Sequence, residues 1–298
     1  MGLSSPVLLS LSAVFIFVGS CIIIASGFTT DWTEYEVDRK AIVSNQDVAK
    51  KIGDSFLRNP IYFTRTHGLY HICFPNNVPT DIGSSTYLTS TCIENPDLYP
   101  QSAVYEKYNS NQKFRFYALR AILVFFLLGL ASLGIAMVIG IISCWSQRTR
   151  YVKMTGIVLI VAIFFFIATL CLFHLVEYWE FSVLKTSPFI GSWDPSLRQS
   201  TEYKHGLSYY GYWIGLVFLS ISDICFFLAV SAIHKERDAA FENKHQAYLQ
   251  YMGADKSVMP YSYGGPYGMN PYGYPGGYYS QYPTMSGNSY YGYLTYGH

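Results

Sequence analysis

Charged residues are scarce in this chain of 298 residues. Asp, Glu, Lys and Arg make up 13% of it, whereas a soluble globular protein carries about 25%. Twenty basic and nineteen acidic side chains leave a net charge of +1, which excludes the clustered basic excess of a nucleic-acid-binding protein. The 20 Phe and 5 Trp exclude a wholly disordered chain, because that much apolar material does not stay solvated.

Catalytic and cofactor motifs are also missing. The sequence contains no HExxH, GxSxG, Walker loop or nucleotide-binding glycine motif. The acid pairs Glu34/Glu36 and Glu177/Glu180 lie in expected loops without a matching base. We therefore expect no catalytic residue, no cofactor, no small-molecule substrate and no enzyme activity. No Asn-x-Ser/Thr sequon occurs, so N-glycosylation is not expected either.

Four runs almost without charge predict four membrane helices. Residues 6–28, 121–145, 154–176 and 207–233 are each long enough to cross a hydrocarbon core, which needs about 20 residues. A soluble protein can bury one such run in its core, but four runs in one chain favour the bilayer. A cleaved signal peptide is the alternative for the first run, because residues 25–27 offer a small-residue cleavage site. The absence of a basic segment before this run favours its retention.

The short segment between the second and third spans sets the orientation. It holds Arg148, Arg150 and Lys153 and no acid, so the positive-inside rule places it in the cytoplasm. Residues 31–119 and 177–205 then form two extracellular loops. The sequence thus predicts a multi-pass protein of the plasma membrane with both termini in the cytoplasm.

The six cysteines divide between the spans and the first outer loop. Cys73 and Cys92 are the only two in that loop, where an oxidising compartment preserves disulfides. We expect them to form a disulfide that stabilises the fold by about 3 kcal/mol on the chain-entropy model. A metal site is disfavoured, since His67 and His71 flank Cys73 without a CxxC or an acidic partner, and we expect none. The other thiols fall in or at the edges of spans, where they act as small apolar groups: Cys21, Cys144, Cys171 and Cys225.

The first outer loop is too long for a bare connection and should have structure of its own. Residues 32–37 alternate imperfectly and predict a strand directly after the first span. Residues 61–74 and 85–93 are rich in Thr, Tyr, Ile and Phe and also predict strands, which the disulfide would join. Residues 39–58 predict a short helix or a mobile loop.

The C-terminal part predicts a second region. We expect a four-span domain over residues 1–240 and a cytoplasmic tail over residues 241–298, with a helix over 234–252 that continues the fourth span. From about residue 257 the chain has no Asp, Glu, Lys or Arg but twelve Tyr and nine Gly, which predicts disorder. A flexible tether is the simplest role, and tyrosine stacking in weak self-association or tyrosine phosphorylation are the alternatives.

Asp223 is the single acid inside a predicted span. Intramembrane acids contact a partner helix or mark an ion pathway. The alternative, which we favour at this stage, is an internal hydrogen bond to a Ser or Thr of the same bundle. Gly211 and Gly215 form a GxxxG motif that lets helices approach closely, by default inside the bundle, with partner docking as the alternative. Arg120 heads the second span, where it can reach the outer surface or an outer-loop acid, and His174 receives no special role.

Several of these motifs resemble the signature of the claudin and calcium-channel gamma-subunit superfamily. That signature is a Trp after the first span, Gly-Leu-Trp, two bridged cysteines, and an Arg at the start of the second helix. The matching residues here are Trp32, Gly68, Leu69, Tyr70, Cys73, Cys92 and Arg120. Residues 29–32 (TTDW) and 208–213 (SYYGYW) resemble the gamma-subunit branch, which includes the transmembrane AMPA-receptor regulatory proteins. Tyr70 departs from the signature Trp, and invertebrate claudin-like proteins fit this departure equally well.

The resemblance implies a membrane α+β fold: a four-helix transmembrane bundle under a small extracellular antiparallel β-sheet, with four strands from the first loop and one from the second. It implies function by contact. One hypothesis is an auxiliary subunit that binds an ion channel or receptor and modulates its gating or trafficking. The alternative is a junction or adhesion protein that makes cis and trans contacts with other claudin-like proteins. The 29-residue second loop, 177–205, favours the auxiliary subunit, which would place the protein at a synapse and the alternative at a cell junction.

Overall fold

The computed structural model describes residues 4–44, 53, 55–82, 86–87, 90–98, 105–106, 108–146 and 148–257. The chain divides into two compact units, Met1–Glu242 and Asn243–His298, and the description below concerns the first. The tail for which we predict disorder lies almost wholly outside the described residues.

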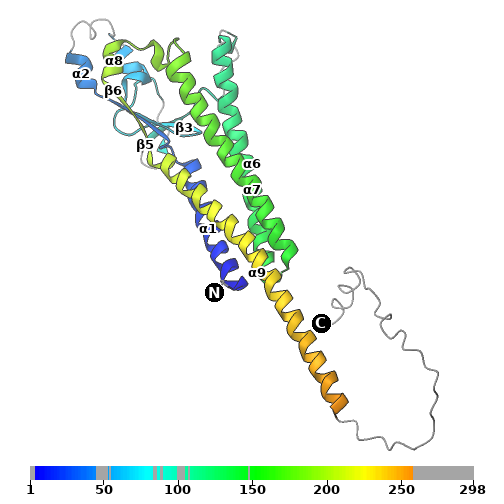
Figure 1. The fold of residues 1–298 in the computed structure, drawn as a ribbon. Coiled ribbons are helices and arrows are strands. Elements are labelled where there is room, and N and C mark those ends of the chain that lie inside the picture. The colour runs from blue at the N-terminus through cyan, green and yellow to red at the C-terminus, as the bar shows by residue number, and fades with distance from the viewer. Residues whose placement is uncertain are drawn as a thin grey trace, which may run out of the picture. The chain divides into compact units, whose positions relative to one another are not determined.

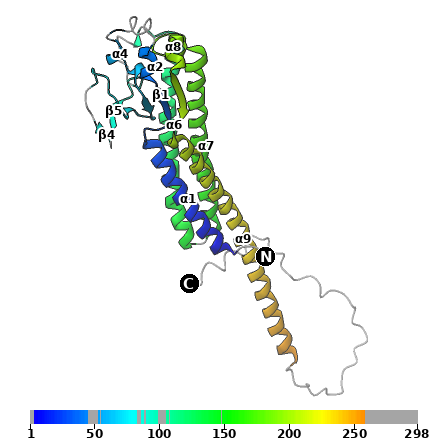
Figure 2. The same ribbon diagram turned by 90° about the vertical axis from the view of Figure 1, so that its left-hand side faces the viewer.

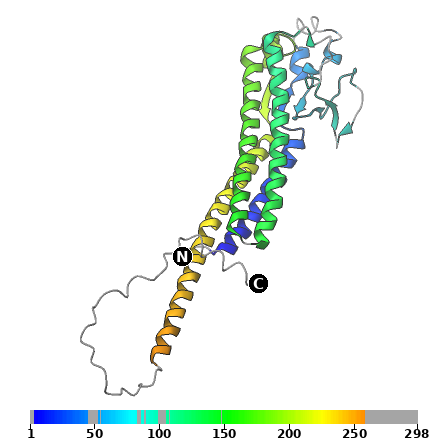
Figure 3. The same ribbon diagram turned by 90° about the vertical axis from the view of Figure 1, so that its right-hand side faces the viewer.

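Four long helices form the body of the first unit: α1 (Ser5–Phe28), α6 (Ser110–Ser146), α7 (Thr149–Tyr178) and α9 (Leu207–Ser257). All four are long and apolar enough to cross a membrane, which confirms the four predicted spans. They lie side by side in all three views (Figures 1, 2 and 3). α6 begins well before the predicted span, and α9 runs on past residue 233, as the helix-compatible pattern of residues 234–252 predicts.

Large aromatic rings fill the centre of the bundle. Phe126, Phe166, Tyr212 and Phe226 are fully buried, and the Tyr212 hydroxyl donates a hydrogen bond to the Phe166 carbonyl oxygen at 3.3 Å. The outward faces of the same helices are apolar too, with exposed side chains such as Phe17, Val138, Phe164 and Ile224. Helices that are apolar on every side suit a protein surrounded by lipid, so this is a membrane bundle rather than a soluble one.

The ends of the four-span domain contact each other. The Ser5 backbone N–H at the start of α1 donates to Glu236 Oε1 of α9 at 2.8 Å, and the Ser5 hydroxyl donates to the same carboxylate. Glu236 therefore satisfies one of the backbone donors that a helix N-terminus leaves unpaired.

A six-stranded antiparallel sheet packs at one end of the bundle (Figure 2). Its strands are β1 (Thr33–Val37), β2 (Arg65–His67), β3 (His71–Phe74), β4 (Thr86–Tyr87), β5 (Ser90–Glu94) and β6 (Thr201–His205). The strand order is β4-β5-β3-β2-β1-β6. The resemblance implies four strands from the first loop and one from the second, and the structure has these as β1, β2, β3 and β5 with β6. The two-residue β4 adds a short sixth strand at the edge.

The edge strand β6, which pairs with β1, comes from the second loop. β6 pairs with β1 over its whole length, from Thr33 opposite His205 to Val37 opposite Thr201. Before β6 the second loop forms a π-helical turn η2 (Trp179–Val183), a 3-10 turn η3 (Ile190–Ser192) and a short helix α8 (Pro195–Gln199). The second loop is therefore a structured part of the sheet end and not a simple connection.

Residues 61–74, which the composition predicts as strand, contain two strands with a turn between them. This segment is a 3-10 turn η1 (Pro60–Tyr62) followed by β2 and β3, which form a hairpin closed by a hydrogen bond from the Gly68 N–H to the His71 carbonyl oxygen at 2.8 Å. Residues 85–93 likewise contain two paired strands, β4 and β5. Where described, residues 39–58 form the short helices α2 (Arg39–Ser44) and α4 (Ser55–Arg58), which agrees with the helical alternative.

Candidate functional site

Trp32 anchors the sheet to the centre of the bundle. Its side chain is 1% exposed, and its indole Nε1–H donates to the Ser26 carbonyl oxygen at 2.6 Å. The ring packs against Phe173 and Tyr212, with centroid distances of 5.2 and 5.0 Å. A buried indole needs a hydrogen-bond acceptor, and here the last turn of α1 supplies it.

The turn at residues 68–70 sits directly on the end of α1. A Cβ atom at Gly68 would lie 2.8 Å from both the Thr29 carbonyl oxygen and Thr30 Cα, so no larger residue fits without movement of the backbone. Leu69 is buried in the bundle core. The Tyr70 ring stacks on Phe28 at 5.8 Å with an interplanar angle of 7°. Tyr70 thus supplies a stacked ring where the family signature has Trp.

The disulfide joins two neighbouring strands. Cys73 and Cys92 stand opposite each other on β3 and β5 and are bonded. Both are buried, and Phe74, next to Cys73, packs with Phe63 in a small core under the sheet. The disulfide inferred from the two loop cysteines is present. It cross-links β3 and β5, on the side of the sheet away from β6.

Arg120 ties the first loop to α6. Its Nε–H donates to the Leu98 carbonyl oxygen at 3.1 Å, and its guanidinium lies 4.2 Å from the centroid of the Phe116 ring. This hydrogen bond is with the backbone of the outer loop, whereas the sequence suggested the outer surface or an outer-loop acid.

Arg115, one helix turn before Arg120 and not singled out by the sequence, carries the stronger electrostatic link. It forms ion pairs with Asp97 at 2.8 Å and Glu180 at 2.6 Å. These three residues come from α6, the loop after β5, and η2, so one guanidinium connects both loops to the bundle. The largely buried position shields the pairs from solvent, which makes them stronger than exposed surface pairs.

Arg65 is a second buried cation, at the centre of the sheet. It is 6% exposed, its Nη1 donates to the carbonyl oxygens of Pro60, Ile61 and Phe63, and its Nε–H donates to His67 Nε2 at 3.1 Å. Burial lowers the pKa of Arg65 to about 10. The pKa of His67 is held well below its usual value, first by burial and then by the charges of Arg65 and Arg115.

A small cavity lies between these groups. Its volume is about 70 Å³, and the side chains around it include Tyr35, His67, Arg115, Glu180 and Tyr203. Pockets for small-molecule ligands measure about 300–1,000 Å³, so this space suits a water molecule or two rather than a substrate. We call this region around Tyr35, His67, Arg115, Glu180 and Tyr203 the sheet–bundle junction. Its side chains pack against one another and pair their charges.

Comparison with known families agrees with this geometry. The model of the PMP-22/EMP/MP20/claudin tight junction family matches residues 17–228, which include every signature contact described above. The chain belongs to this family. A comparison with curated proteins gives no significant match. This claudin-family chain is therefore a multi-pass membrane protein, and proteins of this group generally act on other membrane proteins and not as enzymes.

The GxxxG glycines of this claudin-family bundle face its own first helix. A Cβ at Gly211 would lie 2.7 Å from Ser26 Oγ, and a Cβ at Gly215 would lie 2.7 Å from Ile23 Cγ1. From the opposite side, a Cβ at Gly19 would lie 3.2 Å from the Gly215 carbonyl oxygen. The glycines thus allow close packing of α1 on α9, which is the default that the sequence suggests.

Asp223 is placed differently from the sequence expectation. Its Oδ1 is buried and forms no hydrogen bond within the described part of the chain. On α7, Gly156 lies close to it, since a Cβ there would lie 3.5 Å from Oδ1. The internal bond to Ser or Thr that we favour from the sequence is therefore not formed by this oxygen. The neighbouring Ser222 does bond inside the bundle, to the Ser12 carbonyl oxygen at 2.8 Å.

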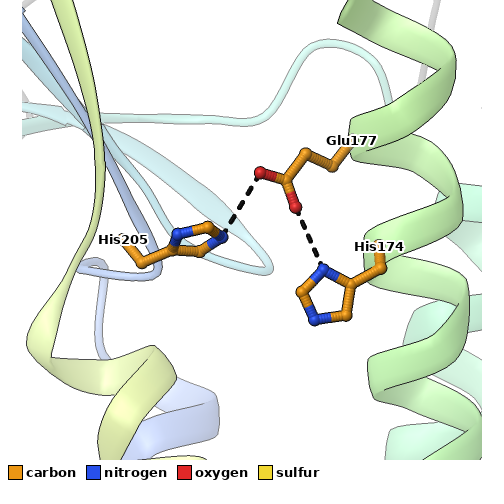
Figure 4. A group of neighbouring side chains, drawn as sticks. All are labelled: His174, Glu177 and His205. Carbon is orange, nitrogen blue, oxygen red and sulfur yellow. Dashed lines mark hydrogen bonds and ion pairs between the residues drawn. The ribbon is translucent and has the colours of Figure 1, made fainter.

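Three of the four acids that seem to lack a basic partner in the sequence lie against a basic side chain. Glu36 pairs with Lys204 at 3.1 Å, Glu180 pairs with Arg115, and Glu177 lies between His174 and His205. The last group brings together two residues of α7 and one of β6 (Figure 4). Except for His174, which lies one turn before Glu177, these basic partners come from elements distant in the sequence, so the sequence alone does not show the pairs.

Proposed function

We propose that this protein is a non-enzymatic auxiliary subunit that binds an ion channel or receptor in the plasma membrane and modulates its gating or trafficking. In this proposal α9 docks on a transmembrane helix of the partner. The sheet end then lies outside the cell and contacts the partner's outer domain.

The observation that carries this proposal is Asp223. A carboxylate oxygen within a membrane helix is costly to leave without a hydrogen bond, and intramembrane acids pair with another group. Oδ1 of Asp223 has no such bond within the described residues. Asp223 as a whole is only half-buried, so in this proposal its side chain rotates away from α7 and a hydroxyl, amide or ammonium group of a partner helix supplies the missing donor.

The outward surface of α9, on the side of the helix away from Asp223, is compatible with docking. Exposed apolar side chains follow one another at helical spacing: Tyr210, Trp213, Ile214, Val217, Ile221, Ile224 and Leu228. Their spacing of three to four residues puts them on neighbouring turns of one face. Such a face is compatible with lipid and with an apolar partner helix. At about 100° per residue Asp223 projects from the other side of α9, toward α7, so the apolar face and the acid would contact different parts of a partner.

A junction protein is the second candidate, and the family description supports it because it includes tight-junction proteins. In that case the sheet end would contact sheets on the same cell and on the opposing cell. The two candidates differ in what should co-purify: a channel or receptor subunit for the first, and claudin-like chains for the second.

The test is affinity purification of the full chain from native membrane, followed by mass spectrometry. We expect Asp223→Asn to weaken recovery of a channel or receptor subunit by about threefold to thirtyfold, because interhelical polar contacts are worth about 0.6–2 kcal/mol. Asp223→Leu should weaken it further, since it removes the contact. Asp238→Asn, at an exposed acid of the same helix, is the matched control. Equal recovery with both Asp223 variants would remove Asp223 from the interface, and recovery of claudin-like chains alone would favour the junction role.

A further inference from the structure

Three side chains of metal-ligand type converge at the sheet–bundle junction. α7 contributes His174 and Glu177, one turn apart, and β6 contributes His205 from the second loop (Figure 4). His174 Nδ1 lies 3.1 Å from Glu177 Oε2, and His205 Nε2 lies 3.3 Å from Glu177 Oε1. One potential ligand atom from each residue lies within 4.8 Å of the other two.

We propose that His174, Glu177 and His205 form a Zn²⁺ site. Two imidazole nitrogens and one carboxylate oxygen are a ligand set that zinc takes in proteins, with a water in the fourth tetrahedral position. With metal–ligand bonds of about 2.0–2.1 Å, neighbouring ligand atoms of a tetrahedral site lie about 3.3 Å apart. The distances from the two imidazoles to Glu177, 3.1 and 3.3 Å, are close to this value but run to different carboxylate oxygens. A small rotation of the carboxylate and an approach of the imidazoles would therefore bring one oxygen and both nitrogens around the ion.

The surroundings of His205 Nε2 indicate that a cation belongs between this nitrogen and the Glu177 carboxylate. This nitrogen is buried and forms no hydrogen bond within the described part of the chain. It faces a carboxylate oxygen of Glu177, and two lone pairs at that distance repel unless a proton or a cation lies between them. A metal ion satisfies Nε2, the carboxylate and His174 together, whereas a proton on Nε2 satisfies only one contact.

The surrounding residues orient the ligands as they do in known zinc sites. His174 Nε2 lies 3.1 Å from the Tyr209 hydroxyl, so an Nε2–H can donate to Tyr209 and leave the Nδ1 lone pair for the metal. The Tyr203 hydroxyl is hydrogen-bonded to Glu177. Outer hydrogen bonds of this kind fix the ring tautomer and the orientation of a metal ligand.

The ligand set also defines which ion fits. Ca²⁺ and Mg²⁺ prefer six or more oxygen ligands, whereas imidazole-rich sites suit Zn²⁺. The three side chains are partly exposed, at 42%, 20% and 26% for His174, Glu177 and His205, so an ion can reach them. A bound Zn²⁺ would connect β6 to α7 and so fix the second loop against the bundle.

The experiment uses the full chain in detergent, purified with a tag that contains no histidine and stripped with a chelator. Calorimetric titration with ZnCl₂ should give one ion per chain, and Co²⁺ should produce the visible absorption of a tetrahedral site, which Zn²⁺ abolishes. Tyr209→Phe should lower the Zn²⁺ affinity about 10- to 100-fold. His205→Gln and Glu177→Gln should lower it further, because each removes a ligand.

Matched controls separate this site from adventitious binding. His234→Gln and Glu202→Gln change the same residue types at exposed positions and should leave the affinity unchanged. Zn²⁺ should also raise the unfolding temperature of the wild type but not of His205→Gln, since an ion stabilises only the state that binds it. Absence of stoichiometric Zn²⁺ binding, or affinity unchanged by Tyr209→Phe and His205→Gln, would overturn the proposal. No partner protein is needed, so the result is independent of the proposed function.

Discussion

Individual residues at the sheet–bundle junction have roles that depend on their protonation. His67 is the clearest example, because its Nε2 accepts a hydrogen bond from the buried Arg65. An imidazole in that position is neutral, because burial and the charges of Arg65 and Arg115 disfavour a second positive charge there, although Glu180 lines the same cavity. The sheet therefore contains a histidine that favours the folded state only while it stays unprotonated.

This leads to a prediction about acid stability. The pKa of His67 is lowered on folding, so the unfolded chain binds a proton that the folded chain does not. Stability should therefore fall as the pH drops below about 6.5, the usual pKa of histidine. His67→Gln keeps an acceptor for Arg65 and cannot protonate, so it should lose less stability between pH 7.5 and pH 5. Thermal unfolding in detergent with chelator present measures this, with His234→Gln as the control. An equal loss in wild type and His67→Gln would contradict it.

The disulfide gives a second prediction at this scale. Cys73→Ser should destabilise the protein by about 3 kcal/mol on the chain-entropy model and reduce its delivery to the cell surface. Cys92→Ser and the double variant should behave alike, because all three remove the same bond. Surface biotinylation and thermal unfolding measure the effects, and Cys144→Ser, at a free cysteine, is the control. A double variant much worse than either single one would mean that the cysteines also act separately.

The sequence identifies some of these residues and not others. Trp32, Cys73, Cys92 and Arg120 stand in a recognisable order along the chain, so their structural positions can be expected. The group around Glu177 cannot be found this way, because His205 lies in another element and reaches Glu177 only through the register of β6 on β1. A His-x-x-Glu pair at residues 174–177 was the one visible signal, and it is too common to indicate a site alone.

At the scale of elements, the close packing of α1 on α9 can be tested with a matched pair of glycines. Gly215→Leu should destabilise the bundle strongly, because even a Cβ there would lie 2.7 Å from Ile23 and overpacking a core costs about 1–3 kcal/mol or more. Gly134→Leu on α6 should be tolerated, since nothing lies within 4 Å of a Cβ at that position. The unfolding temperature in detergent and the surface level measure both. Equal effects of the two variants would mean that α1 and α9 do not pack as described.

Elements differ in how well the sequence predicts them, for a physical reason. A membrane helix needs a long apolar run, and that signal is strong and local. The hairpins of the first loop are not resolved by composition, because β2 has only three residues and the turn at Gly68 is set by contact with α1. β4 is shorter still, with two residues. Strand pairing there depends on tertiary contacts that no single segment encodes.

For the whole molecule, the orientation in the membrane is the property to test. The disulfide-bonded sheet lies at one end of the bundle. Arg148 and the start of α7, with Arg150 and Lys153, follow the other end of α6. We expect an epitope inserted at residues 148–153 to be labelled only after permeabilisation, and one near Asn109 to be labelled on intact cells. Antibody labelling with and without detergent measures this. The reverse pattern would invert the membrane orientation and exclude contact of the sheet with an outer domain.

The pairing of the first strand with the last, and of the first helix with the last, has a consequence for biosynthesis. A ribosome makes β1 and α1 long before β6 and α9 emerge. Until then the edge of β1 has unpaired backbone groups, and the Gly19 face of α1 has no partner. Three inserted helices are therefore an incomplete product that the quality-control machinery of the endoplasmic reticulum can recognise. Release from that compartment has to wait for the last span, so a chain truncated before α9 should be retained and degraded whatever the state of its disulfide.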